Sequence, residues 1–492
     1  MNKKAVWGAA AVLVVAGYGA ATWYFGERAQ SAYQEALAEM QKLVGPEVLV
    51  SQQYTRGFWS SQGQLVLQWT PPAANEDEED GEEADAAPAV ALQPIRFTVE
   101  NTVRHGPLAG WRLAAAVIET RVASVEGADD KVRKTFAKVS APTLTTVRNL
   151  TGSHDIAVAW PAGEVGEGED LLRWQPLVYQ MNLNADRSRL SGDFAWPEFT
   201  LQTQHQPEES DEEPAAAERP PERFSVVLQG MKGDFNMQFQ DGLWLLAPGH
   251  GKGTFSKLTV TRTPATAAAA GAAPEPLMAL KDLSYGINIE RTGAHLGWVT
   301  TMKGTGSVGP LTLESLELNE TVSRIDVEAL KLVQKALVDA YKADPATTSA
   351  AGEMPWAASL MEAVPKFVAA LPAYAVKLSA KVDGEQGELQ YGVELKSVPD
   401  ADQIAEGAWG QAVLKSSALH ASLRLPKAWL PRLAQAAGTK VPKPEEMDMM
   451  LGMAQAQGFV KQEGNHLTSA VRMEDGKVVL NGKEIAVPLM RQ

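Results

Sequence analysis

The sequence predicts an α+β protein with mostly antiparallel strands: one N-terminal transmembrane helix, then an elongated strand-rich body with a few helices. Three observations lead to this prediction. Residues 5–25 carry no charged side chain. Most of the remaining chain alternates apolar and polar residues with the two-residue period of strands that bury one face. Only a few segments show the three-to-four-residue spacing of amphipathic helices.

The apolar stretch 5–25 is long enough to cross a bilayer as a helix. About 21 residues at about 1.5 Å of rise give roughly 31 Å, which matches the hydrocarbon core. Lys3 and Lys4 precede the stretch and the aromatic run 23–25 ends it. Positive charges on the cytoplasmic flank and aromatic residues at the membrane interface are typical of transmembrane helices. We therefore expect residues 1–26 to anchor the protein in a membrane, with a cytoplasmic N-terminus and the body on the far side.

A cleaved secretory signal is the alternative for this stretch, because small residues occur at 19–21. The apolar run continues past them into the aromatic residues and then into an amphipathic helical pattern over 27–43, which favours an uncleaved anchor. Small residues four apart (Ala16 and Ala20, Gly17 and Ala21) would let a second copy pack as a homodimer, although such pairs also arise by chance in a span rich in Ala and Gly.

The charge of the chain is concentrated in two acidic segments. The net charge is −15 from 60 acids and 45 bases. Eight of the acids lie in 75–87 and six in 206–221, which leaves 46 acids against 45 bases elsewhere. A nearly neutral body has no basic face with which to bind nucleic acid. The chain has no Cys, which excludes disulfides, thiolate catalysis and Cys-based metal sites.

These features divide the chain. After the anchor, a strand-rich region over 27–263 carries the acidic segments as solvated loops. The Ala/Pro-rich segment 264–276 has too few large side chains to pack and is predicted to be a flexible linker. A second strand-rich region with helices follows over 277–492.

Within these regions, the pattern predicts strands and a small number of helices. Residues 48–69 form two strands joined near 57–63, and an alternating strand ends at 105–108. Imperfect alternation of leucines predicts a bulge near Glu314 and Ser315. The predicted helices of the second region cover 327–341, 356–371 with an interruption at Pro365, 427–437 and 445–457.

Three segments resemble a known family: YTRGFWSS at 54–61, HGPL at 105–108 and GKVVLNGK at 476–483. With them, the chain resembles the YdgA/YihF-like family of bacterial envelope proteins over nearly its whole length. The resemblance implies a single N-terminal span in the bacterial inner membrane, a periplasmic strand-rich body and a terminal hairpin. It implies no enzymatic activity, because none of the shared motifs is catalytic in kind.

Side chains that could carry chemistry are sparse. None of the seven histidines lies three or four residues from another, so no helical metal pair is formed, and no cofactor is expected. The Gly-rich segments 249–255 and 304–309 lack the Gly-Lys-Ser/Thr ending of a phosphate loop. Ser60 and Ser61 lie outside any Gly-x-Ser-x-Gly elbow and are expected to be turn residues.

Four residues are the candidate contacts for a ligand or partner: Tyr54, Phe58, Trp59 and His105. Phe58 and Trp59 follow a Gly about 30 residues beyond the membrane exit. They could form a packed hairpin corner or an apolar lip that receives an acyl chain or a partner's side chain. His105 is expected to cap backbone groups in a turn, in preference to acting as a general base.

Two functions from different classes follow. In the first, a non-enzymatic, membrane-anchored protein uses the apolar face of a long sheet to bind a lipid or a hydrophobic polypeptide in the periplasm. In the second, the same sheet covers its apolar face, and the protein is a scaffold or assembly factor that docks other envelope proteins. They differ in whether a contiguous apolar patch remains accessible to solvent.

Overall fold

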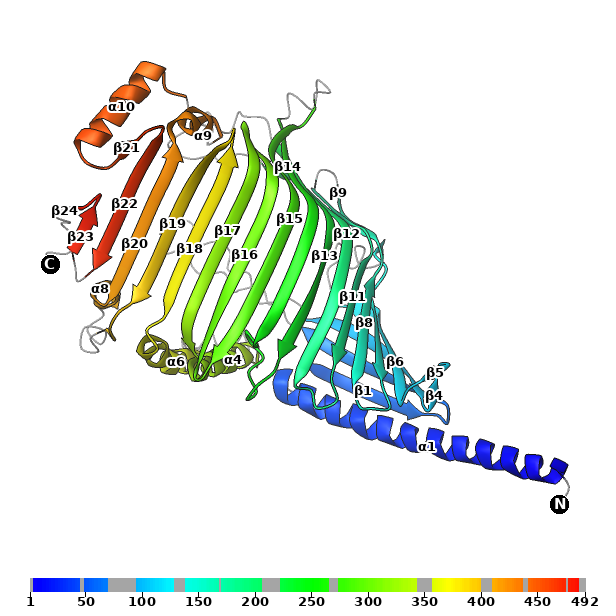
Figure 1. Cartoon of the computed structure of the whole chain (residues 1–492). Coiled ribbons are helices and arrows are strands. Elements are labelled where there is room, and N and C mark those ends of the chain that lie inside the picture. Colours follow the sequence, from blue (N-terminus) through cyan, green and yellow to red (C-terminus); the bar gives the residue numbers. More distant parts are fainter. Residues whose placement is uncertain are drawn as a thin grey trace, which may run out of the picture. The chain divides into compact units, whose positions relative to one another are not determined.

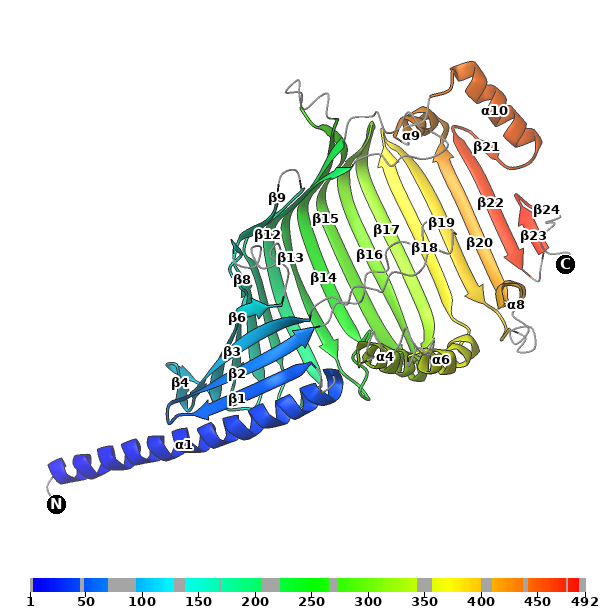
Figure 2. The same cartoon turned by 180° about the vertical axis from the view of Figure 1, so that it is seen from behind.

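The structure is a computed structural model (Figures 1 and 2), and it divides into two compact units. It describes residues 3–44, 48–69, 94–127, 138–167, 170–205, 222–264, 273–342, 356–399, 409–436, 441–474 and 477–485, with the side chains of 3–15 and of 39, 42–44, 167, 205, 264, 341–342 and 409–411 left out. Unit 1 comprises residues 1–165, 174–194 and 334–359, and unit 2 comprises 166–173, 195–333 and 360–492. Both are built mainly from antiparallel strands, as the sequence predicts.

Unit 1 contains a meander in which each strand pairs antiparallel with the next. Its strands are, in order of pairing, β1 (Leu49–Arg56), β2 (Ser60–Trp69), β3 (Ile95–His105), β6 (Ala116–Glu126), β7 (Thr143–Arg148), β8 (His154–Trp160) and β11 (Leu177–Leu183). Between β3 and β6, β4 (Leu108–Ala109) and β5 (Arg112–Leu113) form a separate small hairpin. The chain passes between the units within β9 (Gly163–Glu167), β10 (Asp170–Trp174) and β12 (Arg189–His205).

The helix α1 (Lys3–Val44) packs along the first strands of unit 1 (Figure 2). Leu37 of the helix joins Leu49 and Leu65 of the strands in a buried cluster, because its helical spacing turns it toward the sheet. α1 is one continuous helix, so the amphipathic segment predicted over 27–43 is the direct extension of the apolar stretch. The helix therefore packs against the first strands of the meander over part of its length.

The transmembrane span predicted over residues 1–26 is not confirmed by the structure. Among the residues whose side chains are described, no helix is long and apolar enough to cross a membrane. The side chains of 3–15, which make up half of the predicted span, are not among those described.

Unit 2 is a second antiparallel meander with longer strands (Figure 1). Successive partners are β13 (Glu222–Gln238), β14 (Gly249–Pro264), β15 (Glu275–Thr292), β16 (His295–Val308), β17 (Leu311–Asp326), β18 (Ala373–Val382), β19 (Glu385–Leu395), β20 (Ser417–Pro426), β22 (His466–Glu474), β23 (Lys477–Leu480) and β24 (Lys483–Ile485). The short β21 (Lys461–Glu463) pairs with β22.

Helices join the strands of unit 2 at their ends (Figures 1 and 2). They are α4 (Val327–Lys342), α6 (Ala357–Ala369), α8 (Trp409–Lys415), the 3-10 turn η2 (Lys427–Trp429), α9 (Leu430–Ala436) and α10 (Pro444–Ala456). Residues 334–342 of α4 and 357–359 of α6 belong to unit 1. The helices predicted over 327–341, 427–437 and 445–457 are confirmed within a few residues. The predicted interruption at Pro365 is wrong, because α6 continues through that residue. A proline removes one helical hydrogen bond, and packing of the helix can outweigh that loss.

Several other predictions can be compared with the strands. The bulge predicted near Glu314 and Ser315 is confirmed by a register shift, because Gly306 pairs with Leu313 whereas Gly304 pairs with Leu316. Ser60 and Ser61 open strand β2 and are not turn residues. The acidic segments 75–87 and 206–221 lie outside the described residues. The strands on either side of the predicted linker, β14 and β15, pair with each other in unit 2, and residues 265–272 between them are not described.

Candidate functional site

A buried histidine holds the corner of unit 1 where β1 turns into β2. His105 is the last residue of β3 and is almost completely buried, as is Ser61 at the start of β2. The His105 Nε2 atom lies 2.9 Å from the Ser61 hydroxyl, and Nδ1 lies 3.1 Å from the Phe58 carbonyl oxygen. The backbone amide of His105 donates to the carbonyl of Trp59 at 2.9 Å. His105 therefore bonds to two residues of the 57–59 turn and to Ser61 of β2.

These partners define the tautomer of the imidazole. A carbonyl oxygen can only accept a hydrogen bond, so Nδ1 must carry the proton. Nε2 then accepts from the hydroxyl of Ser61. Burial lowers the pKa of His105 below its ordinary value, and the positive charge of Arg56 acts in the same direction, while the bond to the Phe58 carbonyl opposes them. The ring is therefore held neutral in the folded protein.

The Ser61–His105 pair has the hydrogen-bond direction of a nucleophile with its base, but it lacks access. Both side chains are buried beneath α1, where Gly26 leaves room for the ring: a Cβ atom at that position would lie 2.8 Å from His105 Nδ1. A nucleophile has to approach its substrate within about 3–3.5 Å. The geometry thus fits a structural hydrogen bond that replaces water in a closed corner.

Phe58 and Trp59 lie on the outside of this corner and contact the helix α1. The two rings meet edge to face with centroids 4.8 Å apart. Trp59 stacks on Tyr18 of the helix at 5.6 Å, and a Cβ atom on Gly19 would lie 3.7 Å from the Phe58 ring. Both side chains keep about half of their surface exposed. They form neither a closed core nor a pocket, but a partly packed aromatic patch.

Arg56 ties the same corner to the helix from the other side. Its Nη2 donates to the carbonyl of Trp23 at 3.0 Å, and its guanidinium lies 5.4 Å from the centroid of the Trp23 ring. A guanidinium over an indole face is a favourable cation–π contact. Arg56 was not among the residues predicted as contacts, although it lies inside the YTRGFWSS segment.

Tyr54 lies further along β1, away from the exposed patch. Its ring contacts Tyr33 of α1 with centroids 4.8 Å apart. Burial raises the pKa of Tyr54, and Ser61 lies near enough to lower it in part, although the Tyr54 hydroxyl makes no hydrogen bond of normal geometry. The structure therefore brings Phe58, Trp59 and His105 together and assigns Tyr54 to the contact between helix and sheet.

The sheet of unit 2 has one charged face and one apolar face. On the charged face, Lys303 pairs with Glu317 at 3.0 Å and Lys377 with Glu388 at 2.9 Å. The opposite parity of the same strands carries apolar side chains in register across six neighbouring strands. This apolar row consists of Tyr285, Met302, Leu318, Leu378, Leu389 and Leu423.

Two buried clusters close the apolar face at its ends and leave the row between them. At one end Leu296, Val322, Val327 and Leu330 surround Leu243. At the other end Leu313, Val382 and Trp429 pack together, and Trp429 covers Gly387 of β19. Within the row, Tyr285, Leu389 and Leu423 remain exposed. The next row toward α4 is less uniform, because Thr300 and Glu320 lie in it.

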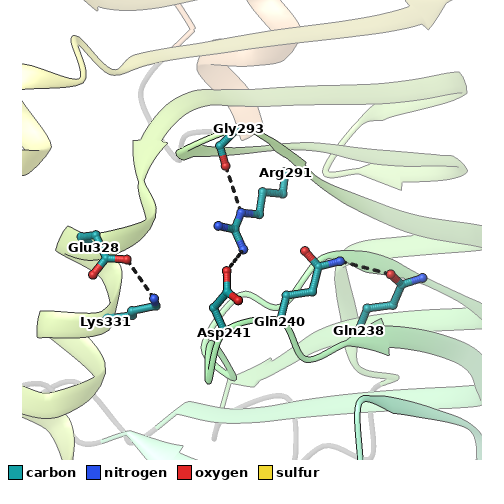
Figure 3. A network of polar contacts seen from close by, with 7 residues as sticks. All are labelled: Gln238, Gln240, Asp241, Arg291, Gly293, Glu328 and Lys331. Atoms are coloured by element: carbon teal, nitrogen blue, oxygen red, sulfur yellow. Dashed lines mark hydrogen bonds and ion pairs between the residues drawn. The ribbon is translucent and has the colours of Figure 1, made fainter.

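A polar network holds the first of these ends in place (Figure 3). Asp241, in the loop between β13 and β14, pairs with Arg291 of β15 at 2.7 Å, and the same arginine donates to the Gly293 carbonyl at 3.0 Å. Arg291 lowers the pKa of Asp241, and Lys331 of α4 adds to this effect. The network fixes the loop that inserts Leu243 into the core. Its role in the described geometry is to close the apolar face.

Elsewhere in the described residues, the candidate places for small ligands are pockets and not metal sites. No group of three or more His, Cys, Asp or Glu residues that could hold a metal ion occurs among the described residues. A cavity of about 520 Å³, lined mainly by apolar side chains, lies beside α10 and includes Val441, Pro444 and Met447. The ion pair of Lys427 with Asp448, at 2.8 Å, lies at its wall.

Comparison with known proteins gives a family. A model of bacterial proteins of unknown function (DUF945) matches residues 1–488. The chain belongs to this family. The match extends through residues of both units. The narrower YdgA/YihF-like grouping is not confirmed by this match. No curated protein and no solved structure matches the chain.

Sequence reasoning missed the apolar row because it depends on strand register. Alternation predicts which residues share a face of one strand, but the neighbours on other strands are set by turns and bulges. It also missed Ser61, which is 44 positions from its partner in the chain. The available signal for Ser61 was its place two residues after Trp59 in the YTRGFWSS segment.

Proposed function

We propose that this protein is a non-enzymatic lipid-binding protein, anchored in the bacterial inner membrane, that holds acyl chains on the apolar face of unit 2. The observation that supports this most directly is the apolar row, which runs across six strands and stays partly exposed between two closed ends. If the apolar face served only as part of a core, other elements would cover it along the whole length of the strands. Here the covering helices and loops gather at the strand ends.

The dimensions of the row suit an acyl chain. Six strands are separated by five spacings of about 4.8 Å, so the row is about 24 Å long. One leaflet of a bilayer provides about half of the roughly 30 Å hydrocarbon core for its acyl chains. Each methylene group that moves from water onto such a surface contributes up to about 0.8 kcal/mol. A single chain lying along the row would therefore bind without any charged contact.

The anchor in this proposal rests on the sequence. Residues 5–25 are uncharged and are framed by Lys3 and Lys4 on one side and aromatic residues on the other. This arrangement favours a span with the N-terminus in the cytoplasm and both units in the periplasm. Membership of the YdgA/YihF-like envelope proteins, suggested by the three family-like segments, is consistent with it. A lipid-binding face tethered beside a bilayer would have its ligand close by.

Photocrosslinking tests the lipid-binding face. The full chain would be reconstituted in liposomes that contain a phospholipid with a photoactivatable group at the end of its acyl chain. After irradiation, peptide mapping should find lipid on β15 to β20, around the apolar row. Labelling there should fall several-fold in Leu389→Glu, because a carboxylate on the row has to be desolvated by an acyl chain.

Val299→Glu is the matched control for this substitution. Val299 is 44% exposed and lies on the charged face, whereas Leu389 is 43% exposed and lies on the apolar row. Both variants add the same charge at the same exposure, so only the face differs. Equal labelling in Leu389→Glu and Val299→Glu would contradict the proposal. Copurification of a polypeptide with the row, in place of lipid, would contradict it too.

A scaffold that docks other envelope proteins is the second candidate, and the helix α10 favours it. No residue of α10 is buried, and Met449, Met450 and Met453 are all exposed. Flexible methionine side chains are common at surfaces that bind several partners. Replacing these three by Ser should remove a docked partner without lowering stability, whereas Glu445→Gln on the same helix should retain it. Copurification of an envelope protein lost only in the Ser variant would support this candidate.

A further inference from the structure

The small hairpin β4–β5 of unit 1 exposes large apolar side chains to an unusual degree. Trp111 at its tip is 95% exposed and Leu113 is 70% exposed, and Leu108 is also exposed. The hairpin is only a few residues long, and its strands pair Leu108 with Leu113 and Ala109 with Arg112. A lone exposed apolar residue needs no explanation, but a cluster on one tip marks a surface that contacts something apolar.

The hairpin is held firmly enough to present these side chains. Ala109 and Ala114 are completely or almost completely buried with Val117 and Val147 in a core of their own. The amide of Ala114 donates to the Pro107 carbonyl at 3.1 Å. Arg104 of β3 packs against Gly110, where a Cβ atom would lie 3.2 Å from the arginine side chain, and forms an ion pair with Glu119 at 2.7 Å. The small buried residues fix the base, so the large ones point outward.

The hairpin lies at the same end of the unit 1 strands as the 57–59 turn. His105 connects the two, since its backbone and ring hold the turn while the next residues begin the hairpin. The following turn, 149–153, lies beside them, because the Ala115 amide donates to the Arg148 carbonyl at 2.8 Å. Leu150 in that turn is exposed as well. The three turns form an edge whose exposed apolar residues are Phe58, Trp59, Leu108, Trp111, Leu113 and Leu150.

This edge coincides with the end of the apolar stretch in α1. The 57–59 turn contacts the helix at Tyr18 and Gly19, and Arg56 reaches the carbonyl of Trp23. These helix residues lie within the last turns of the apolar stretch 5–25. The preceding part of α1 projects beyond the strands on this side (Figures 1 and 2). If 5–25 crosses a bilayer, its interface lies at the level of these turns.

We propose that the edge of the three turns is seated in the interface of the phospholipid bilayer, with Trp111 and Leu113 inserted among the headgroups and the first methylene groups. Tryptophan is enriched at this depth because its ring is apolar and its N–H can bond to water or headgroups. This inference rests on the membrane anchor of the proposed function and is independent of acyl-chain binding by unit 2.

A single environment-sensitive label tests the seating. The chain contains no Cys, so Arg112→Cys creates the only thiol and can carry an NBD fluorophore next to the intact Trp111 and Leu113. Glu126→Cys is the control, because it is exposed at the opposite end of β6, about 34 Å along the strand from Ala116. The full-length labelled proteins would be reconstituted in liposomes with and without lipids that bear a nitroxide quencher near the headgroup.

The label at 112 should be quenched several-fold more strongly than the label at 126, with emission shifted to the blue. Adding Trp111→Ser and Leu113→Ser should reduce the quenching at 112 toward the level at 126, while flotation of the protein with the liposomes stays unchanged. A protein that floats but shows equal quenching at both positions overturns the seating alone. A protein that fails to float overturns the anchor and the seating together, whereas acyl-chain crosslinking to unit 2 is measured separately.

Discussion

The two units expose apolar surface in opposite ways. In unit 1 a group of exposed aromatic and aliphatic side chains lies on turns at the ends of strands, around the His105 corner and the β4–β5 hairpin. In unit 2 the exposed side chains of the apolar row lie in the middle of strands, between the two buried clusters. Exposed apolar turns can insert only their tips into an apolar phase, whereas an exposed strand centre can hold a ligand along its length.

The difference teaches that burial has to be judged by position as well as by residue type. Trp429, Trp59 and Trp111 are the same amino acid, yet the first is part of a core, the second is half packed and the third projects into solvent. Replacing each of them by Ala and measuring the loss of unfolding free energy should therefore compare the two regions on one scale. The following predictions proceed from the largest expected effect to the smallest.

Trp429→Ala should produce the largest loss of stability. Trp429 is buried in the cluster that closes one end of the apolar face, where its ring covers Gly387. Its indole N–H has no hydrogen-bond partner in the described structure, so the loss comes from apolar contacts and the cavity left behind. We expect a decrease of about 3–5 kcal/mol in the free energy of unfolding of unit 2.

Chemical denaturation followed by intrinsic fluorescence measures this decrease, with Trp111→Ala as the matched control. The control removes the same side chain from a position with almost no contacts and should leave the unfolding midpoint unchanged. If both variants unfold alike, the distinction between a closed strand end and an exposed turn does not hold.

His105→Ala should have the next largest effect, on unit 1. The substitution removes the bonds to Ser61, which is buried, and to the Phe58 carbonyl, which is partly buried, and leaves both groups without this partner. A buried polar group without a partner costs about 1–3 kcal/mol. Denaturation of unit 1 should show a loss of this order, and the exposed His420→Ala should show none. Faster hydrogen exchange at the amide of His105, which bonds to Trp59, would locate the change at the corner.

How far the sequence could predict these regions follows from the same residues. The alternation of apolar residues and the bulge at 314–315 were predicted because strand periodicity and its interruptions are local properties. The Ser61–His105 bond and the contact of Gly26 with His105 were not, because they join segments far apart in the chain. The apolar row could be assigned only after the register of six strands was known, and its exposure only after the helices were placed.

Acidification should lower the free energy of unfolding of unit 1. Burial lowers the pKa of His105 below its ordinary value of about 6.5. The unfolded chain therefore binds a proton at a pH at which the folded chain does not. The contribution of His105 to the free energy of unfolding is therefore complete above about pH 6.5, and it decreases as the pH falls toward the folded-state pKa.

His154 contributes in the same direction, since burial and the charges of Arg148 and Arg187 also lower its pKa. The pH dependence of unit 1 should therefore flatten partly in His105→Asn and further in the double variant with His154→Asn. Unfolding midpoints measured between pH 5 and 8 provide the comparison. A slope that survives in the double variant would assign the effect to other groups.

Trp59→Ala is expected to have the smallest effect and decides how the 57–59 turn is used. A packed corner would lose several kcal/mol, but Trp59 is 57% exposed and its main contact is one stacked ring, Tyr18 at 5.6 Å. Such an aromatic pair contributes about 0.5–1.5 kcal/mol, so the unfolding free energy should fall by only about 1 kcal/mol. The same variant should weaken quenching of a label at 112 by headgroup nitroxides, because the turn and the hairpin share one edge. A loss as large as that of Trp429→Ala would make the turn part of the core and remove it from the membrane-facing edge.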